Sequence, residues 1–69
     1  MDPNQIEVNF TCHSPSQNQI DKYANIRFAA KQVAELINTA CPDSREKSLA
    51  MTNLEQSVMW ANASIARNE

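Results

Sequence analysis

The sequence predicts an all-α protein, an antiparallel hairpin of two long helices that follows an N-terminal arm. Two long stretches, about Gln19 to Ala40 and Ser44 to Arg67, contain neither Gly nor Pro, and many of their residues lose little side-chain freedom in a helix. Apolar residues recur in both at helical spacing. Between the two stretches, Cys41-Pro42-Asp43 is long enough only for a tight helix–helix connection. We expect an arm at 1–18 and a hairpin domain at 19–69.

The arm is polar and is interrupted by Pro3 and Pro15. Ile6, Val8 and Phe10 alternate with polar residues, which is typical of a short strand. An extended arm laid across a neighbouring chain explains the pattern equally well, and a short extra helix is a further alternative.

The first hairpin helix has one apolar face and one charged face. On the charged face, Arg27 and Lys31 lie four residues apart and are therefore neighbours on the helix surface. They form either a solvated face or a two-cation patch that binds phosphate, for which Arg is well suited. The apolar positions are Ile20, Tyr23, Ile26, Ala30, Val33, Ala34 and Ile37.

The second hairpin helix is apolar almost all round. Leu49, Trp60 and Ala63 fall on the side opposite its main stripe, and a helix of this kind must be covered on most sides. A chain of 69 residues is too short to cover it alone. We therefore expect the helix to form the core of a homo-oligomer. The main stripe consists of Ala50, Leu54, Val58, Ala61 and Ile65.

The start of this second helix has an unusual charge pattern. Asp43, followed by Glu46, has the form of a capping box. Arg45 and Lys47 lie in the first turn, where the helix dipole disfavours cations. They would either hold an anion or form ion pairs between subunits.

Three single residues allow two interpretations each, and a fourth, Asn62, allows one. His13, the only His, is a surface or interface residue or a ligand contact, and no residue stands at a spacing that would make it a catalytic base. Trp60 packs on a neighbouring helix or stacks on a nucleobase. Asn62, among apolar neighbours, would fix the register between subunits. Arg67 complements the helix dipole or, repeated by symmetry, forms a basic ring.

Composition excludes several classes of protein. Two Cys and one His are too few for a closed zinc site. Neither a secretory signal nor an apolar run long enough to span a membrane is present, so we expect a soluble intracellular protein. A net charge of −2 argues against binding of a long nucleic acid but not against a small anionic ligand.

Most of the chain, about residues 10 to 67, resembles a known family. The family is that of the phage anti-CBASS protein that sponges cyclic oligonucleotides, and the hairpin module of the Thoeris anti-defence proteins is similar. The motifs that carry the resemblance are Phe10-Thr11-x-His13-x-Pro15, Tyr23-x-x-Ile26-Arg27-x-x-Ala30, Cys41-Pro42-x-Ser44-Arg45-Glu46-Lys47-Ser48-Leu49-Ala50-x-Thr52-x-Leu54-Glu55 and Met59-Trp60-Ala61-Asn62-Ala63-x-Ile65-Ala66-Arg67.

The resemblance implies a compact homohexamer in the cytoplasm of the infected bacterial host. It would bind cyclic nucleotides without cleaving them, needing no cofactor or metal, and so keep the CBASS effector inactive. One pocket, on the threefold axis, would take cyclic trinucleotides such as cyclic tri-adenylate. Another, between paired subunits, would take cyclic dinucleotides such as 3',3'-cGAMP.

The resemblance also implies site residues. Arg67 would contact phosphate in the trinucleotide pocket, the small side chain of Ala61 would leave room near the axis, and Asn62 and Ser64 would join them.

The dinucleotide pocket would draw on Cys12, His13 and a cation near Arg27. The family commonly has Tyr before this His, where the present chain has Cys12. A Tyr can stack on a base and a Cys cannot, a difference of about 1–3 kcal/mol per base.

Two other functions are weighed against the sponge. One is a structural or protein-docking role for a small helical oligomeric phage protein. The other is a phosphodiesterase, which is poorly supported because one His and scattered carboxylates do not form a two-metal arrangement.

Overall fold

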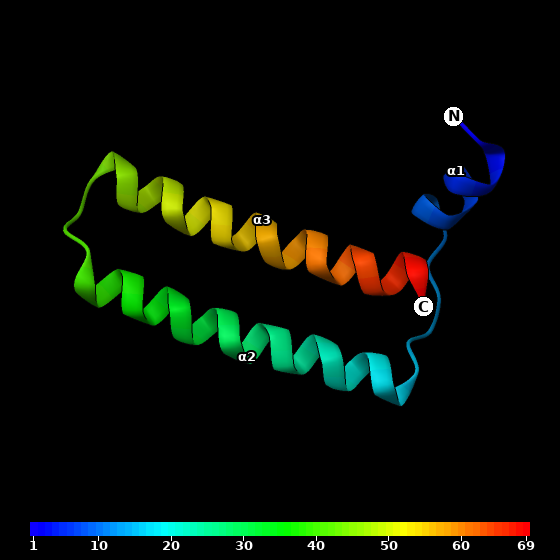
Figure 1. Cartoon of the computed structure of the whole chain (residues 1–69), viewed down its shortest axis with the longest axis horizontal. Helices are drawn as coiled ribbons and strands as arrows, with labels where there is room; N and C mark the ends of the chain where they lie inside the picture. Colours follow the sequence, from blue (N-terminus) through cyan, green and yellow to red (C-terminus); the bar gives the residue numbers. More distant parts are fainter.

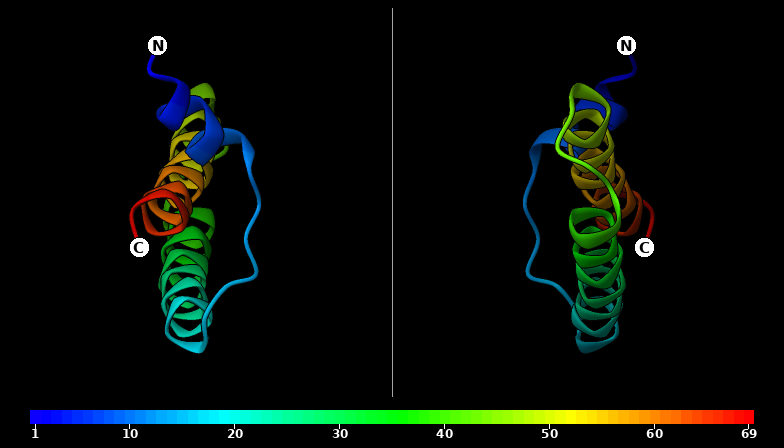
Figure 2. Two further views of the ribbon diagram at one scale, coloured as in Figure 1. Left: turned by 90° about the vertical axis from the view of Figure 1, so that its right-hand side faces the viewer. Right: turned by 90° about the vertical axis from the view of Figure 1, so that its left-hand side faces the viewer.

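The computed structural model describes all 69 residues and consists of three helices without a strand. They are α1 (Pro3–Phe10), α2 (Gln17–Ala40) and α3 (Arg45–Asn68). The long helices α2 and α3 run antiparallel and side by side, and α1 lies beyond the open end of the hairpin, near the C-terminus (Figure 1). The molecule is a thin slab of 45 × 30 × 12 Å (Figure 2). None of the helices is long and apolar enough to cross a membrane. The prediction of an all-α hairpin is confirmed.

The arm contains a helix, so the strand and the fully extended arm predicted for Ile6–Phe10 are wrong. Asp2 caps this helix by accepting a hydrogen bond of 3.0 Å from the Asn4 backbone N–H. Pro3 occupies the first helical position, where its missing N–H costs nothing. Ile6 and Phe10 are four residues apart and therefore lie on the same side of α1. The alternative of a short extra helix is the one that the structure shows.

A capping box starts α2 at Gln17, two residues before the expected position. The Ser16 hydroxyl accepts a hydrogen bond of 3.2 Å from the Gln19 N–H, and the Gln19 side chain accepts one of 3.0 Å from the Ser16 N–H. At the other end, the Cys41 N–H donates to the Ile37 carbonyl at 3.0 Å. Pro42 follows directly and prevents the helix from continuing.

The cap of α3 is Ser44, and the predicted capping box of Asp43 with Glu46 is wrong. The Ser44 hydroxyl accepts a hydrogen bond of 3.1 Å from the Lys47 N–H. Asp43 instead pairs with the Lys47 ammonium at 2.9 Å, and the same ammonium donates to the Asn38 carbonyl at 2.9 Å. Lys47 therefore satisfies an otherwise unpaired carbonyl at the end of α2. This cation is engaged within its own chain.

The hairpin seam is the only apolar contact of any size between the helices, and it leaves no residue fully buried. The chain exposes 5569 Å², whereas a compact monomer of this mass exposes about 4,400 Å². Its radius of gyration is 15.2 Å, against about 11 Å for a compact domain of this length. A single chain is therefore more extended, and buries less of its surface, than a compact domain of this length. The α3 residues on the seam include Ala50, Leu54, Val58, Ala61 and Ile65, as predicted, and all are half-buried.

Large apolar side chains remain exposed away from the seam. Phe28 and Leu36 on α2 are each 64% exposed, and Met59 and Trp60 on α3 are each 67% exposed. Most of the Trp60 side chain is therefore not covered by its own chain. Surfaces of this kind usually mark contacts with other molecules.

Candidate ligand-binding sites

A pocket of about 290 Å³ lies between the arm and the last turns of α3. The arm reaches α3 because the linker after α1 runs past the C-terminal end of the hairpin (Figure 1). An ion pair of 2.8 Å between Lys22 and Glu69 joins α2 to the end of α3 there. The pocket is lined by Val8, Asn9, Thr11, Cys12, His13, Ala63, Ala66 and Arg67; we call it the arm pocket.

The arm pocket combines a cation with several small polar groups. Ala63, Ala66 and Arg67 are three and four residues apart, so they share one side of α3. The two alanines contribute only small side chains to the wall that they share with Arg67, and Cys12 and His13 line the pocket from the arm. Arg binds phosphate through two parallel hydrogen bonds. The arrangement suits a small ligand that carries a phosphate.

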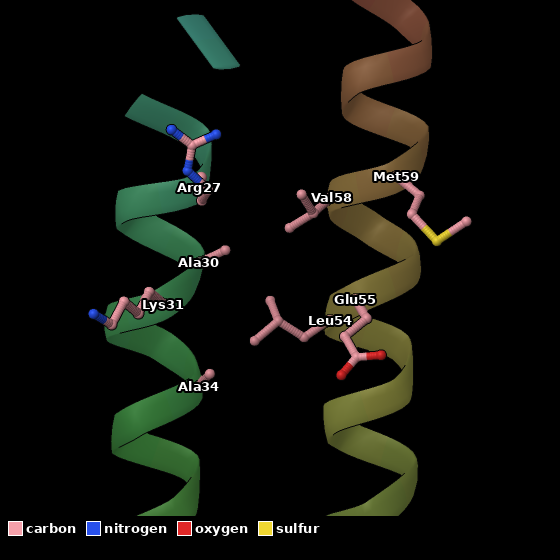
Figure 3. A pocket seen from close by; sticks show the side chains of 8 residues that line it. All are labelled: Arg27, Ala30, Lys31, Ala34, Leu54, Glu55, Val58 and Met59. Carbon is pink, nitrogen blue, oxygen red and sulfur yellow. The ribbon is translucent and has the colours of Figure 1, made fainter. Parts of the chain in front are cut away.

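A second hollow is a groove of about 310 Å³ on one flank of the hairpin (Figure 3). Arg27 and Lys31 form its rim on α2, and Glu55 and Met59 form its rim on α3. Its floor is apolar and consists of Ala30, Ala34, Leu54 and Val58. We call it the hairpin groove.

The family model for the Acb2/Tad1 hairpin domain matches residues 2–66, nearly the whole chain. The chain belongs to the Acb2/Tad1 hairpin family. The predicted resemblance is thereby confirmed, and membership points to an anti-defence sponge role. No curated protein and no solved structure matches the chain.

The Acb2/Tad1 hairpin brings together some predicted site residues and separates others. Cys12 and His13 meet Arg67 in the arm pocket. Arg27 lies in the hairpin groove instead. Within one chain, the three residues assigned to the dinucleotide pocket are therefore divided between two hollows. Arg67, which was assigned to the trinucleotide pocket, shares the arm pocket with Cys12 and His13.

The other residues assigned to the trinucleotide pocket do not line the arm pocket of the same Acb2/Tad1 hairpin. Ala61 is half-buried on the seam. The side-chain oxygen of Asn62 is buried and accepts no hydrogen bond. Ser64 is exposed, and its carbonyl accepts a hydrogen bond of 2.9 Å from the Asn68 side chain.

Sequence reasoning did not identify Ala63 and Ala66 as lining residues. Ala63 precedes Ala66 by three residues and Arg67 by four, so helical spacing was the signal that places Ala63 next to each of them on α3. Thr11 was named only as part of a motif, and its place in the pocket depends on the path of the linker. No cluster of three or more His, Cys, Asp or Glu lies where it could hold a metal ion, and both cysteines are free and exposed.

Proposed function

We propose that this Acb2/Tad1 hairpin protein binds cyclic oligonucleotide second messengers and sequesters them without cleavage. By removing the messenger in the cytoplasm of an infected bacterium, it blocks activation of CBASS effectors. The observation that carries this proposal is the arm pocket, which Arg67 lines together with His13 and two alanines. A cation with free space next to it is what a cyclic phosphodiester ligand requires.

The proposal includes a homohexamer as the working unit. The exposed apolar side chains and the large surface of a single chain support self-association. Around a threefold axis, copies of Arg67 would contact the phosphates of a cyclic trinucleotide such as cyclic tri-adenylate. Ala61, Asn62 and Ser64 lie outside the arm pocket of their own chain, so they would reach the trinucleotide only through this assembly.

Cyclic dinucleotides are the second proposed ligand class. Cys12 and His13 would contact them from the arm, and Arg27 would be supplied by a neighbouring subunit because it lies in the other hollow of its own chain. In this arrangement the dinucleotide binds between paired subunits.

Native mass spectrometry with a panel of cyclic di- and trinucleotides tests the proposal. We expect a hexamer that retains intact ligands, and we expect the same ligands to be recovered intact after denaturation. Ligand held at 100 times its dissociation constant should add about 2.7 kcal/mol to the free energy of unfolding. Recovery of a linear product, or no response to any ligand of the panel, would contradict sequestration.

A protein-docking role is the second candidate, because Phe28 and Leu36 expose an apolar surface on α2. Under this alternative, added cyclic tri-adenylate would leave the melting temperature of the wild-type protein unchanged. An increase that depends on Arg67 would favour the sponge.

A further inference from the structure

The hairpin groove has rims of opposite charge. Arg27 and Lys31 give the α2 rim two positive charges, and Glu55 gives the α3 rim one negative charge. In Figure 3, Lys31 lies level with Glu55 along the hairpin, and Arg27 lies level with Val58 and Met59. The two ion pairs of the chain are elsewhere, at Lys22–Glu69 and Lys47–Asp43. The charged rims of the groove are therefore available to another molecule.

We propose that the hairpin groove is closed by the hairpin groove of a second copy of this chain, across a twofold axis parallel to the helices. This axis lays α2 of each copy on α3 of the other. Rotation about this axis does not change the position of a residue along the helix direction. Because Lys31 and Glu55 are level within one chain, Lys31 then lies opposite Glu55 of the partner subunit. The apolar floors of the two grooves then face each other and lose their contact with water.

A twofold axis perpendicular to the helices is disfavoured. It would lay α2 on α2 and bring Arg27 and Lys31 against the same residues of the second copy, and like charges across an interface suppress pairing. Charge complementarity therefore selects the parallel axis. The inference rests on the homo-oligomer of the proposed function and specifies which flank forms one of its contacts.

The test uses the full chain with Lys31→Glu or Glu55→Lys. Lys31→Glu makes both rims acidic at the Lys31 and Glu55 positions, and Glu55→Lys makes both basic. Each variant alone should associate at least about tenfold more weakly than the wild type in sedimentation, because like charges then oppose each other. Glu46→Lys is the control, since residue 46 lies on the opposite side of α3 from Glu55.

Mixing the two variants distinguishes an effect on a contact between subunits from an effect within a single hairpin. An equimolar mixture should form mixed oligomers, detected by mass, because each acidic rim then meets a basic rim of the other variant. An effect confined to one chain would not be restored by mixing. Single variants that assemble like the wild type, or a mixture that forms no mixed oligomer, would overturn the proposed contact. Capture of cyclic tri-adenylate by the wild type, measured in the same series, tests the sponge function separately.

Discussion

His13 and Arg67 line one pocket although they lie near opposite ends of the chain. The His is held by the linker between α1 and α2, and the Arg by the last turn of α3. The pocket therefore depends on the path of the arm past the end of the hairpin. A single chain therefore has a site with a cationic residue before any assembly. The arm contributes His13 to this site and would contact the proposed ligand through it.

Reversal of the Arg67 charge should abolish binding of cyclic tri-adenylate. Arg67→Glu removes charge-assisted hydrogen bonds to phosphate, each worth about 1.5–3 kcal/mol, and adds repulsion. Calorimetric titration should show no binding, while native mass spectrometry should show the wild-type assembly. Arg45→Glu is the matched control at the other end of α3. If Arg67→Glu disrupts the assembly, the residue serves subunit contact instead of ligand binding.

An aromatic residue at position 12 should strengthen binding of cyclic dinucleotides. Cys12 lines the arm pocket and is exposed. Cys12→Tyr would add a stacking surface worth about 1–3 kcal/mol, which is a gain of roughly 5- to 150-fold in affinity. Titration with 3',3'-cGAMP measures the change. Cys12→Ser should bind like the wild type, and equal affinities for the Tyr and Ser variants would remove position 12 from the pocket.

The two long helices were predictable because their apolar periodicity persists over many turns. In the arm, the alternation of Ile6, Val8 and Phe10 extends over only five residues, which is too short to distinguish a strand from a helix. Asp2 as the N-cap and Pro3 as the first helical residue favour the helix that the structure shows. At the start of α3, Asp43 and Ser44 are both good caps. In the structure, Ser44 caps the helix and the Asp43 carboxylate pairs with the Lys47 ammonium.

The candidate sites were only partly predictable. The separation of Arg67 from Ala61 follows from helical geometry, since six residues place them on different sides of α3. The meeting of Arg67 with His13 does not, because it depends on how the linker turns after α1. The opposition of Lys31 and Glu55 across the groove depends on the register of α2 against α3, which the sequence pattern does not specify.

Loss of either helix cap should destabilise the hairpin. Ser16 and Ser44 each accept a backbone hydrogen bond at the start of a long helix. Ser16→Ala and Ser44→Ala should each cost about 1 kcal/mol, which corresponds to roughly 4–8 °C in melting temperature for a chain of this size. Thermal unfolding followed by circular dichroism measures this. Ser57→Ala, in the interior of α3, should not lower the melting temperature, and equal effects at all three positions would refute the capping role.

Trp60 should report assembly through its fluorescence. It is the only Trp, and it is 67% exposed in the single chain. If assembly covers α3 on most sides, the indole moves from water to an apolar environment, and its emission shifts to shorter wavelength as protein concentration rises. Dilution below the dissociation constant should reverse the shift, with sedimentation under the same conditions giving the oligomeric state. Emission typical of a water-exposed indole in a confirmed oligomer would place Trp60 outside the subunit contacts. It would then be available to stack on a base, and added cyclic tri-adenylate should quench it.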